Sequence, residues 1–364
     1  MRAALSERAP RAQDVVIVFC AAGYDVEELL AAAGDEAAPA RVVGCTSMRS
    51  FTDTEQVPSG CLAALLTAED CAFGICHLER DDADIAGTAR RAAETARERA
   101  GAPLAHAALL LLTDGLTPDQ REVAHGAYEV TTALIPFVGG AAADDLTWSE
   151  THTFGDGRVL RNGIAAVWIN SARPIGVSVD HGWSPVGRPM LVTRAQGTIV
   201  HELDGMPAFA AYAAERGGGL DPDDPELFLK LIDGPVGSPN AHGRYDVRQL
   251  HAFLPGGGGI NFNAGVSEQS ILQLMSADAT TLLEGARRAA RQAVAQLREP
   301  ARTVLVFSCG SRVPLLGDRA AAEAEAISAE LHGAPVCGFY TYGEFARVTG
   351  SGGVHNSSVA VLAM

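Results

Sequence analysis

The sequence contains a single lysine, Lys230, and its other positive charges are arginines. With 28 basic and 44 acidic residues, its formal net charge at pH 7 is −16. A chain this acidic repels nucleic-acid phosphates unless it carries a local basic face, and no run of basic residues is present. The scarcity of lysine also argues against Schiff-base chemistry and against a phosphate-binding loop of the Gly-Lys type. We therefore expect no nucleic-acid partner.

A long apolar run and a recognisable cysteine pattern are missing as well. The longest apolar run, around residues 107–112, is far shorter than a membrane span, and residues 1–13 lack the apolar core of a secretory signal. The seven cysteines form no Cys-x-x-Cys motif and no metal-binding spacing with histidine. They fit reduced thiols that serve as small core residues, so we expect a cytoplasmic protein with no membrane contact and no bound metal.

One pattern is repeated three times along the chain. Each copy has an apolar strand, a helix-forming segment, the motif Pro-x-hydrophobic-hydrophobic-Gly and a closing apolar strand. The copies span residues 15–66, 109–169 and 304–363. Because internal repetition reports architecture, we predict an α/β fold. It has two related α/β halves built from repeated β-α-β-hairpin units, with mixed sheets covered by helices.

A second similarity supports two related halves. The segment Ala-Arg-Arg-Ala-Ala occurs at residues 89–93 and 286–290, in each case on a predicted helix that leads into the next strand. Compositional coincidence in a chain rich in alanine and arginine is the alternative. At 364 residues the chain exceeds the size that one hydrophobic core usually serves. We predict one domain at residues 14–173 and another at residues 174–364.

The second half also carries additional segments. Residues 186–193 and 198–203 predict a β-hairpin. Asp204 predicts the start of a helix that runs to about Arg216, where the three glycines at 217–219 end it.

The third copy differs from the others in the polar residues that follow its strands. Two strands joined by a crossing helix should lie parallel, so the residues beyond their ends emerge at one sheet edge, where open α/β sheets bind ligands. This copy places Cys309 and Arg312 after one strand, and Tyr340, Tyr342 and Glu344 at the end of the other. Arginine suits a carboxylate, glutamate suits an ammonium group, and phenols can cover an apolar body. We predict that this set binds an amino acid or a similar small acid.

Other interpretations of these residues stay open. Arg312 and Glu344 can instead pair with each other across the sheet edge. His355 and Asn356 precede the last strand, so His355 can reach the pocket or face solvent. Asn356 can serve the turn, since Asn162 occupies the matching position in the second copy.

The motifs assembled so far resemble those of FIST proteins, which are bacterial sensory modules with an N-terminal and a C-terminal part. The resemblance covers nearly the whole chain and is carried by Phe307-Ser308-Cys309-x-x-Arg312, Gly338-Phe339-Tyr340-Thr341-Tyr342-Gly343-Glu344, His355-Asn356, Gly139-Gly140 through Asp144, Phe154-Gly155-Asp156-Gly157 and Gly182-Trp183-Ser184-Pro185-Val186-Gly187. It implies an intracellular sensor that binds a small ligand such as an amino acid. It also implies a ligand-binding role for Arg248, which stands where the family pattern has an arginine.

The sequence departs from the family pattern at two places, residues 48–51 and residues 233–237. The first departure concerns any N-terminal ligand site, and the second concerns detail of the C-terminal pocket. Family members are often fused to signalling outputs. Since no such output is evident here, we expect the signal to pass to a separate partner or across a subunit interface.

Two other functions compete with amino-acid sensing. A thiolate at Cys309, with Arg312 nearby and His355 as base, would make a nucleophilic enzyme, but Cys309 directly follows an apolar strand and lacks a nucleophile-elbow motif. The resemblance also implies haem-dependent nitric oxide sensing in part of the family, for which His181, His201 and His355 are candidate ligands. We expect a sensor without a catalytic residue and without a cofactor.

Overall fold

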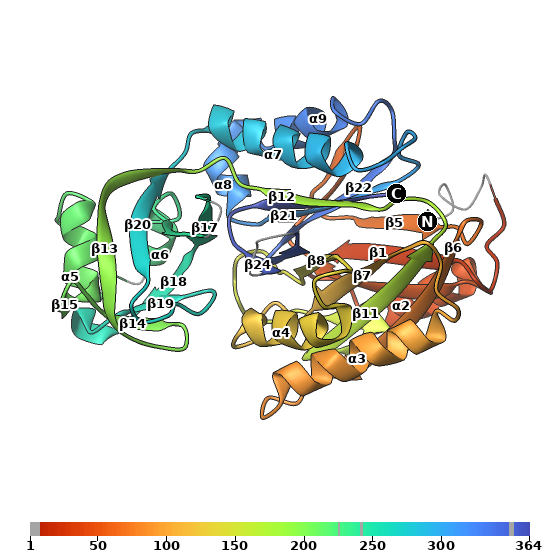
Figure 1. Ribbon diagram of the computed structural model, residues 1–364, viewed down its shortest axis with the longest axis horizontal. Helices are drawn as coiled ribbons and strands as arrows, with labels where there is room; N and C mark the ends of the chain where they lie inside the picture. Colours follow the sequence, from red (N-terminus) through yellow and green to blue (C-terminus); the bar gives the residue numbers. More distant parts are fainter. Residues whose placement is uncertain (1–7, 225, 241–242, 349–352) are drawn as a thin grey trace.

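The computed structural model describes residues 8–224, 226–240, 243–348 and 353–364. The chain folds into a core of three β-sheets covered by helices, and a smaller lobe, residues 184–276, that projects from one side (Figure 1). The lobe carries a fourth sheet. The predicted α/β fold with mixed sheets covered by helices is confirmed.

Each of the three copies forms one β-α-β-hairpin-β unit. Unit 1 contains β1 (Val15–Ala21), α2 (Val26–Ala37), β2 (Arg41–Ser47), the hairpin β3 (Ser50–Thr52) and β4 (Gln56–Val57), and β5 (Cys61–Leu66). Unit 2 contains β7 (His106–Thr113), α4 (Gln120–Thr131), β8 (Phe137–Ala141), the hairpin β9 (Thr153–Gly155) and β10 (Arg158–Leu160), and β11 (Gly163–Ser171). Unit 3 contains β21 (Val304–Cys309), α8 (Arg312–Leu316), η2 (Gly317–Arg319), α9 (Ala321–Ser328), β22 (Val336–Thr341), the hairpin β23 (Glu344–Arg347) and β24 (Gly353–His355), and β25 (Val359–Ala363).

The first two strands of every unit are parallel, as the crossing helix requires. β1 pairs with β2, β7 with β8 and β21 with β22 in parallel register, while the closing strands β5, β11 and β25 are antiparallel to the first strands. All residues of β1 and of β21 are buried, as expected for strands with both faces covered. The prediction that the two loops of each unit leave from one sheet edge is therefore confirmed.

Each unit places its hairpin in the sheet of another unit. The unit 2 hairpin extends the unit 1 sheet through β9 and β2, the unit 3 hairpin extends the unit 2 sheet through β23 and β8, and the unit 1 hairpin extends the unit 3 sheet through β3 and β22. The three units thus exchange hairpins in a closed cycle. Both predicted domains contribute to this cycle, and the boundary at residues 173 and 174 stays a prediction.

In units 1 and 3 the glycine of the repeated motif makes room for this exchange. In each sheet it lies opposite a buried phenylalanine of the incoming hairpin, and the three pairs are Gly44–Phe154, Gly139–Phe345 and Gly338–Phe51. A Cβ atom on Gly338 would lie 2.4 Å from the Phe51 ring, and one on Gly44 would lie 2.5 Å from the Phe154 ring. A side chain at either glycine would occupy the space of the phenylalanine.

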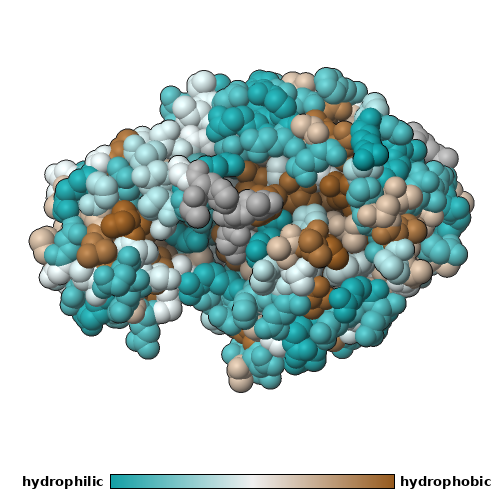
Figure 2. Space-filling model, in the orientation of Figure 1, coloured by the Kyte–Doolittle hydropathy of each residue, from teal (hydrophilic) through white to brown (hydrophobic). Residues whose placement is uncertain are grey.

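The segments between the units supply further strands and helices of the core: β6 (Cys71–Glu79), α3 (Ile85–Arg99), β12 (Gly176–Asp180) and α7 (Ala279–Val294). α3 packs on β6 and β11, and α7 packs on β12 and β25, so the two helices cover opposite sides of the core (Figure 1). Figure 2 shows hydrophilic residues over α7 and α3. Between the sheets, the Phe339 ring lies 4.2 Å from that of Phe19 and 5.7 Å from that of Phe307, which joins units 1 and 3.

Aspartates begin the long helices. The carboxylates of Asp25, Asp84, Asp119 and Asp278 each accept a hydrogen bond from a backbone N–H of the first turn of α2, α3, α4 and α7. These bonds satisfy donors that have no partner inside the helix.

The lobe contains β13 (Ser184–Gln196), β14 (Ile199–Leu203), β15 (Met206–Pro207), α5 (Ala208–Glu215), α6 (Leu227–Lys230), β16 (Val236–Pro239), β17 (Tyr245–Arg248), β18 (Leu250–Phe253), η1 (Pro255–Gly257), β19 (Ile260–Phe262) and β20 (Ile271–Ser276). The predicted hairpin is confirmed as β13 and β14. The predicted helix start at Asp204 is wrong, since α5 begins at Ala208. Asp204 has a positive φ of 53° and accepts the backbone N–H of Leu191 at 2.8 Å, which makes it a turn residue.

Three arginines cover the outer edge of β6, the last strand of the unit 2 sheet. Their guanidinium groups donate to alternate backbone carbonyls: Arg41 to Phe73 at 2.6 Å, Arg99 to Ile75 at 2.6 Å and Arg158 to His77 at 2.7 Å. Carbonyls engaged in this way do not offer a template for pairing with another strand.

Within the described ranges, every helix is too short or too polar to cross a lipid bilayer.

Candidate functional site

The segments that follow the second strand of each unit meet in the core. Ala143 donates its backbone N–H to Thr46 at 3.0 Å, Met48 to Tyr340 at 3.2 Å, and Tyr342 to Ala141 at 3.2 Å. These bonds link unit 2 to unit 1, unit 1 to unit 3, and unit 3 to unit 2. The carboxyl ends of the three strand pairs are thereby brought together.

Unit 3 places a buried carboxyl group beside a buried thiol at this point. Glu344 accepts the Thr341 hydroxyl at 2.6 Å and the Ser358 hydroxyl at 2.8 Å, and it also accepts a hydrogen bond from Cys309. Burial raises the pKa of Glu344 to about 7, although these hydrogen bonds oppose the shift. The carboxyl group therefore changes its charge near neutral pH.

The thiol of Cys309 is poorly suited to nucleophilic chemistry. Burial, together with the neighbouring Glu344, raises the pKa of Cys309 to about 12, and the Ser311 hydroxyl donates to the sulfur at 3.2 Å. The group is a neutral thiol at physiological pH. Burial also lowers the pKa of His355 to about 4, and its Nε2 lies 3.0 Å from the Ala346 carbonyl oxygen, so this ring is engaged elsewhere.

A residue of the lobe completes the polar network. The Ser311 and Ser357 hydroxyls are 2.9 Å apart, and Ser357 donates to the Gln249 side chain at 2.7 Å. The backbone N–H of Gln249 approaches Oδ1 of Asn356 at 3.4 Å. Gln249 thus connects the lobe to the strand ends of unit 3. We call the network of Cys309, Ser311, Glu344, Asn356, Ser357 and Gln249 the polar cluster.

Aromatic rings form the second contact between the lobe and the core. The ring of Tyr342 stacks on that of Trp148 at 4.0 Å with an interplanar angle of 6°, and the His251 ring meets Trp148 edge-on at 5.0 Å. Tyr342 also donates its hydroxyl to Asp144. Burial alone would raise the pKa of Asp144, but hydrogen bonds from Tyr342, Ser149 and other donors hold it well below its usual range.

Arg312 and Glu344, which were expected to face each other or a shared ligand, have separate partners. Arg312 is buried in the first turn of α8, where its Nε donates to Glu323 at 2.7 Å. Its other nitrogens donate to the backbone carbonyls of His181 at 3.0 Å and Leu282 at 2.9 Å. The guanidinium therefore joins α8, α9, α7 and the entrance to the lobe, and it does not line the polar cluster. The ring of Tyr340 is likewise part of the core, 5.3 Å from that of Phe51.

Arg248 lies at the end of β17, one residue before Gln249. Its guanidinium donates to the carbonyl of Val247 at 3.0 Å, and it forms no ion pair with a carboxylate in the described part of the chain. Burial lowers the pKa of Arg248, while Asp246 acts in the opposite direction. Burial lowers the pKa of His355 most, Asp246 raises it and Arg248 lowers it.

Sequence reasoning identified Cys309, Glu344, Asn356 and Arg248 but missed Gln249, Trp148 and His251. The last three come from the lobe and from unit 2. Their only sequence signal is their position beside Arg248 or after the Asp144 motif, which does not show that they reach unit 3.

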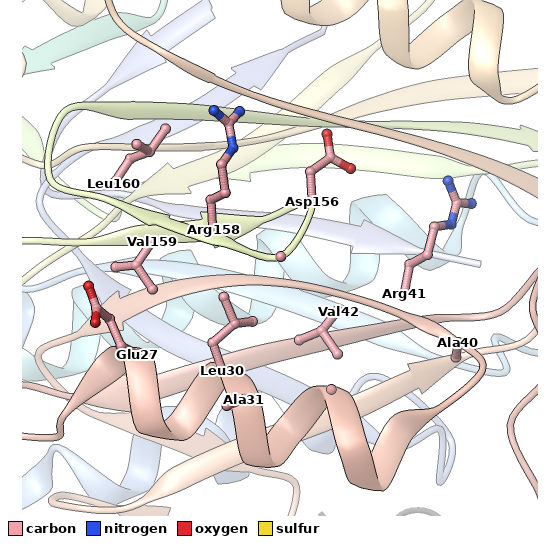
Figure 3. Close-up of a pocket in the computed structure, with 12 residues that line it drawn as sticks. Glu27, Leu30, Ala31, Ala40, Arg41, Val42, Asp156, Arg158, Val159 and Leu160 are labelled. Carbon is pink, nitrogen blue, oxygen red and sulfur yellow. The ribbon is translucent and has the colours of Figure 1, made fainter.

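A separate pocket of about 770 Å³ opens between α2 and the hairpin of β9 and β10 (Figure 3). Leu30, Val42 and Val159 point into the space between helix and hairpin, so its floor is apolar. The guanidinium groups of Arg41 and Arg158 point away from α2, toward the β6 carbonyls described above. The pocket is not part of the polar cluster.

Two of the three candidate haem ligands are engaged in hydrogen bonds within the protein. His181 uses both ring nitrogens, since Nδ1 accepts the Trp183 N–H at 2.9 Å and Nε2 lies 3.0 Å from the Tyr245 carbonyl oxygen. His355 is engaged as described, and His201 lies on β14 in the lobe sheet. No group of three or more potential metal-ligating side chains occurs among the residues that the structure describes.

The protein thus has two parts. One is an α/β core of three units that exchange hairpins, and the other is a lobe that contacts the strand ends of unit 3. The chain belongs to the FIST family: the FIST N domain matches residues 14–206 and the FIST C domain matches residues 208–347. FIST domains are sensory domains, and the predicted resemblance is confirmed.

Relatives that match most of the chain come from mycobacteria. The chain is 26% identical over 343 residues to the uncharacterized protein Rv0628c of Mycobacterium tuberculosis strain H37Rv, covering 92% of this chain and 86% of the relative. It is 27% identical over 259 residues to the uncharacterized protein Mb0898c of Mycobacterium bovis, covering 69% of this chain and 66% of the relative. A shorter similarity, 32% over 78 residues, joins 21% of the chain to 15% of the uncharacterized protein MJ1623 of Methanocaldococcus jannaschii.

Proposed function

We propose that this protein is a cytoplasmic sensor that binds a small carboxylate-bearing molecule, an amino acid above all, and passes the signal to a separate partner. The proposal rests on the surroundings of Arg248. Its side chain is partly buried and donates to the Val247 carbonyl, yet it has no ion-pair partner among the described residues. A charge that has lost part of its hydration is stabilised when an opposite charge approaches it.

The surroundings of Arg248 suit a zwitterion. Asp246 and Arg248 are two residues apart on β17, so their side chains leave the strand on the same side. A ligand carboxylate can receive two parallel hydrogen bonds from the arginine, and its ammonium group can approach the aspartate. These two residues take the roles that the sequence suggested for Arg312 and Glu344.

Binding at this place would affect how the lobe contacts the core. Residues 248–251 contact unit 3 through Gln249 and unit 2 through His251. A ligand held by Arg248 therefore changes the free energy of the lobe–core contact. Such a differential contact is what a sensor needs in order to shift between two states.

The test uses the full chain and known compounds. Wild-type protein is screened by thermal shift and by isothermal titration calorimetry against each of the twenty L-amino acids, sodium acetate and sodium succinate. We expect one or a few amino acids to raise the melting temperature, because a ligand of the native state stabilises it.

Arg248→Gln should abolish this response, and Asp246→Asn should weaken binding of the amino acid more than that of a plain carboxylate. Arg194→Gln is the matched control, because Arg194 pairs with Glu202 on the exposed surface of the lobe. The proposal fails if no compound binds, or if Arg248→Gln binds the active compound as tightly as Arg194→Gln does.

A further inference from the structure

Two cysteines of unit 1 lie directly opposite each other on neighbouring strands. Cys20 of β1 and Cys61 of β5 are partners in the antiparallel register. In the same register Ala21 donates its backbone N–H to Gly60 at 3.0 Å, so Ala21 and Gly60 form a hydrogen-bonded pair. Because the two kinds of pair alternate along an antiparallel ladder, Cys20 and Cys61 form a non-hydrogen-bonded pair.

This geometry brings the two thiols within bonding range after a small adjustment. Opposite residues of a non-hydrogen-bonded pair have Cα atoms about 4.5 Å apart, and disulfides span Cα distances of about 4.4–6.8 Å. Opposite side chains also leave the sheet on one face. The neighbouring pairs agree, since Val18 and its partner Ala63 both pack toward α2. Burial raises the pKa of Cys20, and the neighbouring Cys61 raises it as well.

The two thiols differ in exposure to solvent, so Cys61 should react before Cys20. Cys61 is exposed and Cys20 is fully buried, and both are free thiols in the structure. We propose that Cys20 and Cys61 form a reversible intramolecular disulfide when the protein meets a low-molecular-weight disulfide. This would be a redox site on unit 1, separate from the ligand site of the lobe.

The reaction proceeds by two thiol–disulfide exchanges. The Cys61 thiolate attacks oxidised glutathione, which gives a Cys61–glutathione mixed disulfide and releases one glutathione. Cys20, whose pKa burial raises to about 12, gives up its proton as its sulfur attacks the Cys61 sulfur and forms the Cys20–Cys61 bond, so this exchange is the slower of the two. The second glutathione leaves as a thiolate and takes up the proton that Cys20 loses. Two protein thiols are oxidised, and one glutathione disulfide is reduced to two thiols.

A Cys20–Cys61 disulfide would affect the hairpin of unit 1. Cys20 is next to the last residue of β1, and Cys61 is the first residue of β5, directly after the hairpin that unit 1 places in the unit 3 sheet. The disulfide would fix the base of that hairpin to β1. Both exchanges run backward when reduced thiol is in excess, so the change is reversible.

The experiment treats native full-length protein with oxidised glutathione, quenches it with acid, and counts free thiols after denaturation. Of the seven cysteines, five should remain free, and peptide mapping without reductant should find Cys20 joined to Cys61. Dithiothreitol should restore all seven. The rate should rise as pH increases above neutrality, because burial raises the pKa of Cys61.

Cys61→Ser is the test variant and Cys71→Ser, a partly buried cysteine of β6, is the matched control. Cys61→Ser should keep all six of its thiols, whereas Cys71→Ser should lose two of six. Three results would overturn the proposal: a stable mixed disulfide at Cys61 with Cys20 still free, a bond from Cys61 to Cys337, or a bond between two protein molecules.

Discussion

The exchange of hairpins makes a specific prediction for Gly338 and Phe51. Gly338→Ala places a methyl group 2.4 Å from the Phe51 ring, closer than Cβ atoms approach any neighbour, so the ring or the strand must move. Overpacking of this kind costs about 1–3 kcal/mol of unfolding free energy. Phe51→Ala removes a fully buried ring that the unit 1 hairpin packs against Gly338 of β22, and it should cost about 3–5 kcal/mol.

The two changes should not be additive. With Phe51 truncated, the methyl group of Gly338→Ala enters the space that the ring has left, so the double variant should be more stable than the sum of the single effects by about 0.5–3 kcal/mol. Urea unfolding followed by tryptophan fluorescence measures all three variants. Gly34→Ala is the control: Gly34 lies within α2 with no atom within 4 Å of the added Cβ, so this change should stabilise the protein by about 0.5–1 kcal/mol. Two results would contradict this explanation of Gly338. One is that Gly338→Ala stabilises the protein as Gly34→Ala does, and the other is that the unfolding free energies of the single variants add exactly in the double variant.

Two further predictions concern buried charges in unit 3. The pKa of Glu344 is raised to about 7 in the folded protein, so its protonated form stabilises the fold below the ordinary carboxyl pKa, and that contribution is lost as pH rises to 7. Glu344→Gln should therefore gain about 3 kcal/mol relative to wild type between pH 5 and pH 8 in urea unfolding, and a difference that is constant over this range would contradict the shifted pKa. Arg312→Met leaves Glu323 buried without its cation and should lower the unfolding free energy by about 3–5 kcal/mol. The double variant with Glu323→Gln should recover a large part of this loss. Equal stability of the single and double variants would show that the pair is not coupled.

The local architecture could be predicted from the sequence because it is encoded in continuous segments. Runs such as Val15–Ala21 are apolar at every position, which specifies a strand buried on both faces, and a helix between two such strands requires parallel pairing. The partner of each hairpin could not be predicted in this way. A strand such as Ser50–Thr52 is too short to select a sheet by itself, and its place depends on Phe51 finding the space above Gly338.

The candidate site could likewise be predicted only in part from the sequence. Cys309 and Glu344 meet because both follow strands whose ends share one edge, which is a consequence of topology. Arg312 is only three residues beyond Cys309, but α8 starts there and turns the side chain toward Glu323 on α9. Such a reorientation by a short helix has no signature in the strand pattern. The lobe residues, Gln249 above all, reach unit 3 across more than a hundred residues of sequence, and no local rule gives that contact.

Because the hairpins are exchanged in a closed cycle, a structural change in one unit can alter strand pairing in the other units. Glu344 begins the strand that unit 3 adds to the unit 2 sheet, and β22, which ends three residues earlier, receives the hairpin of unit 1. A displacement of this segment therefore alters strand pairing in two sheets at once. Gln249 contacts the same region through Ser357 and Asn356, so the lobe is connected to both sheets by a few hydrogen bonds. Because packed sheets change between discrete arrangements and do not deform continuously, a ligand that moves the lobe against unit 3 would shift the whole core between such arrangements.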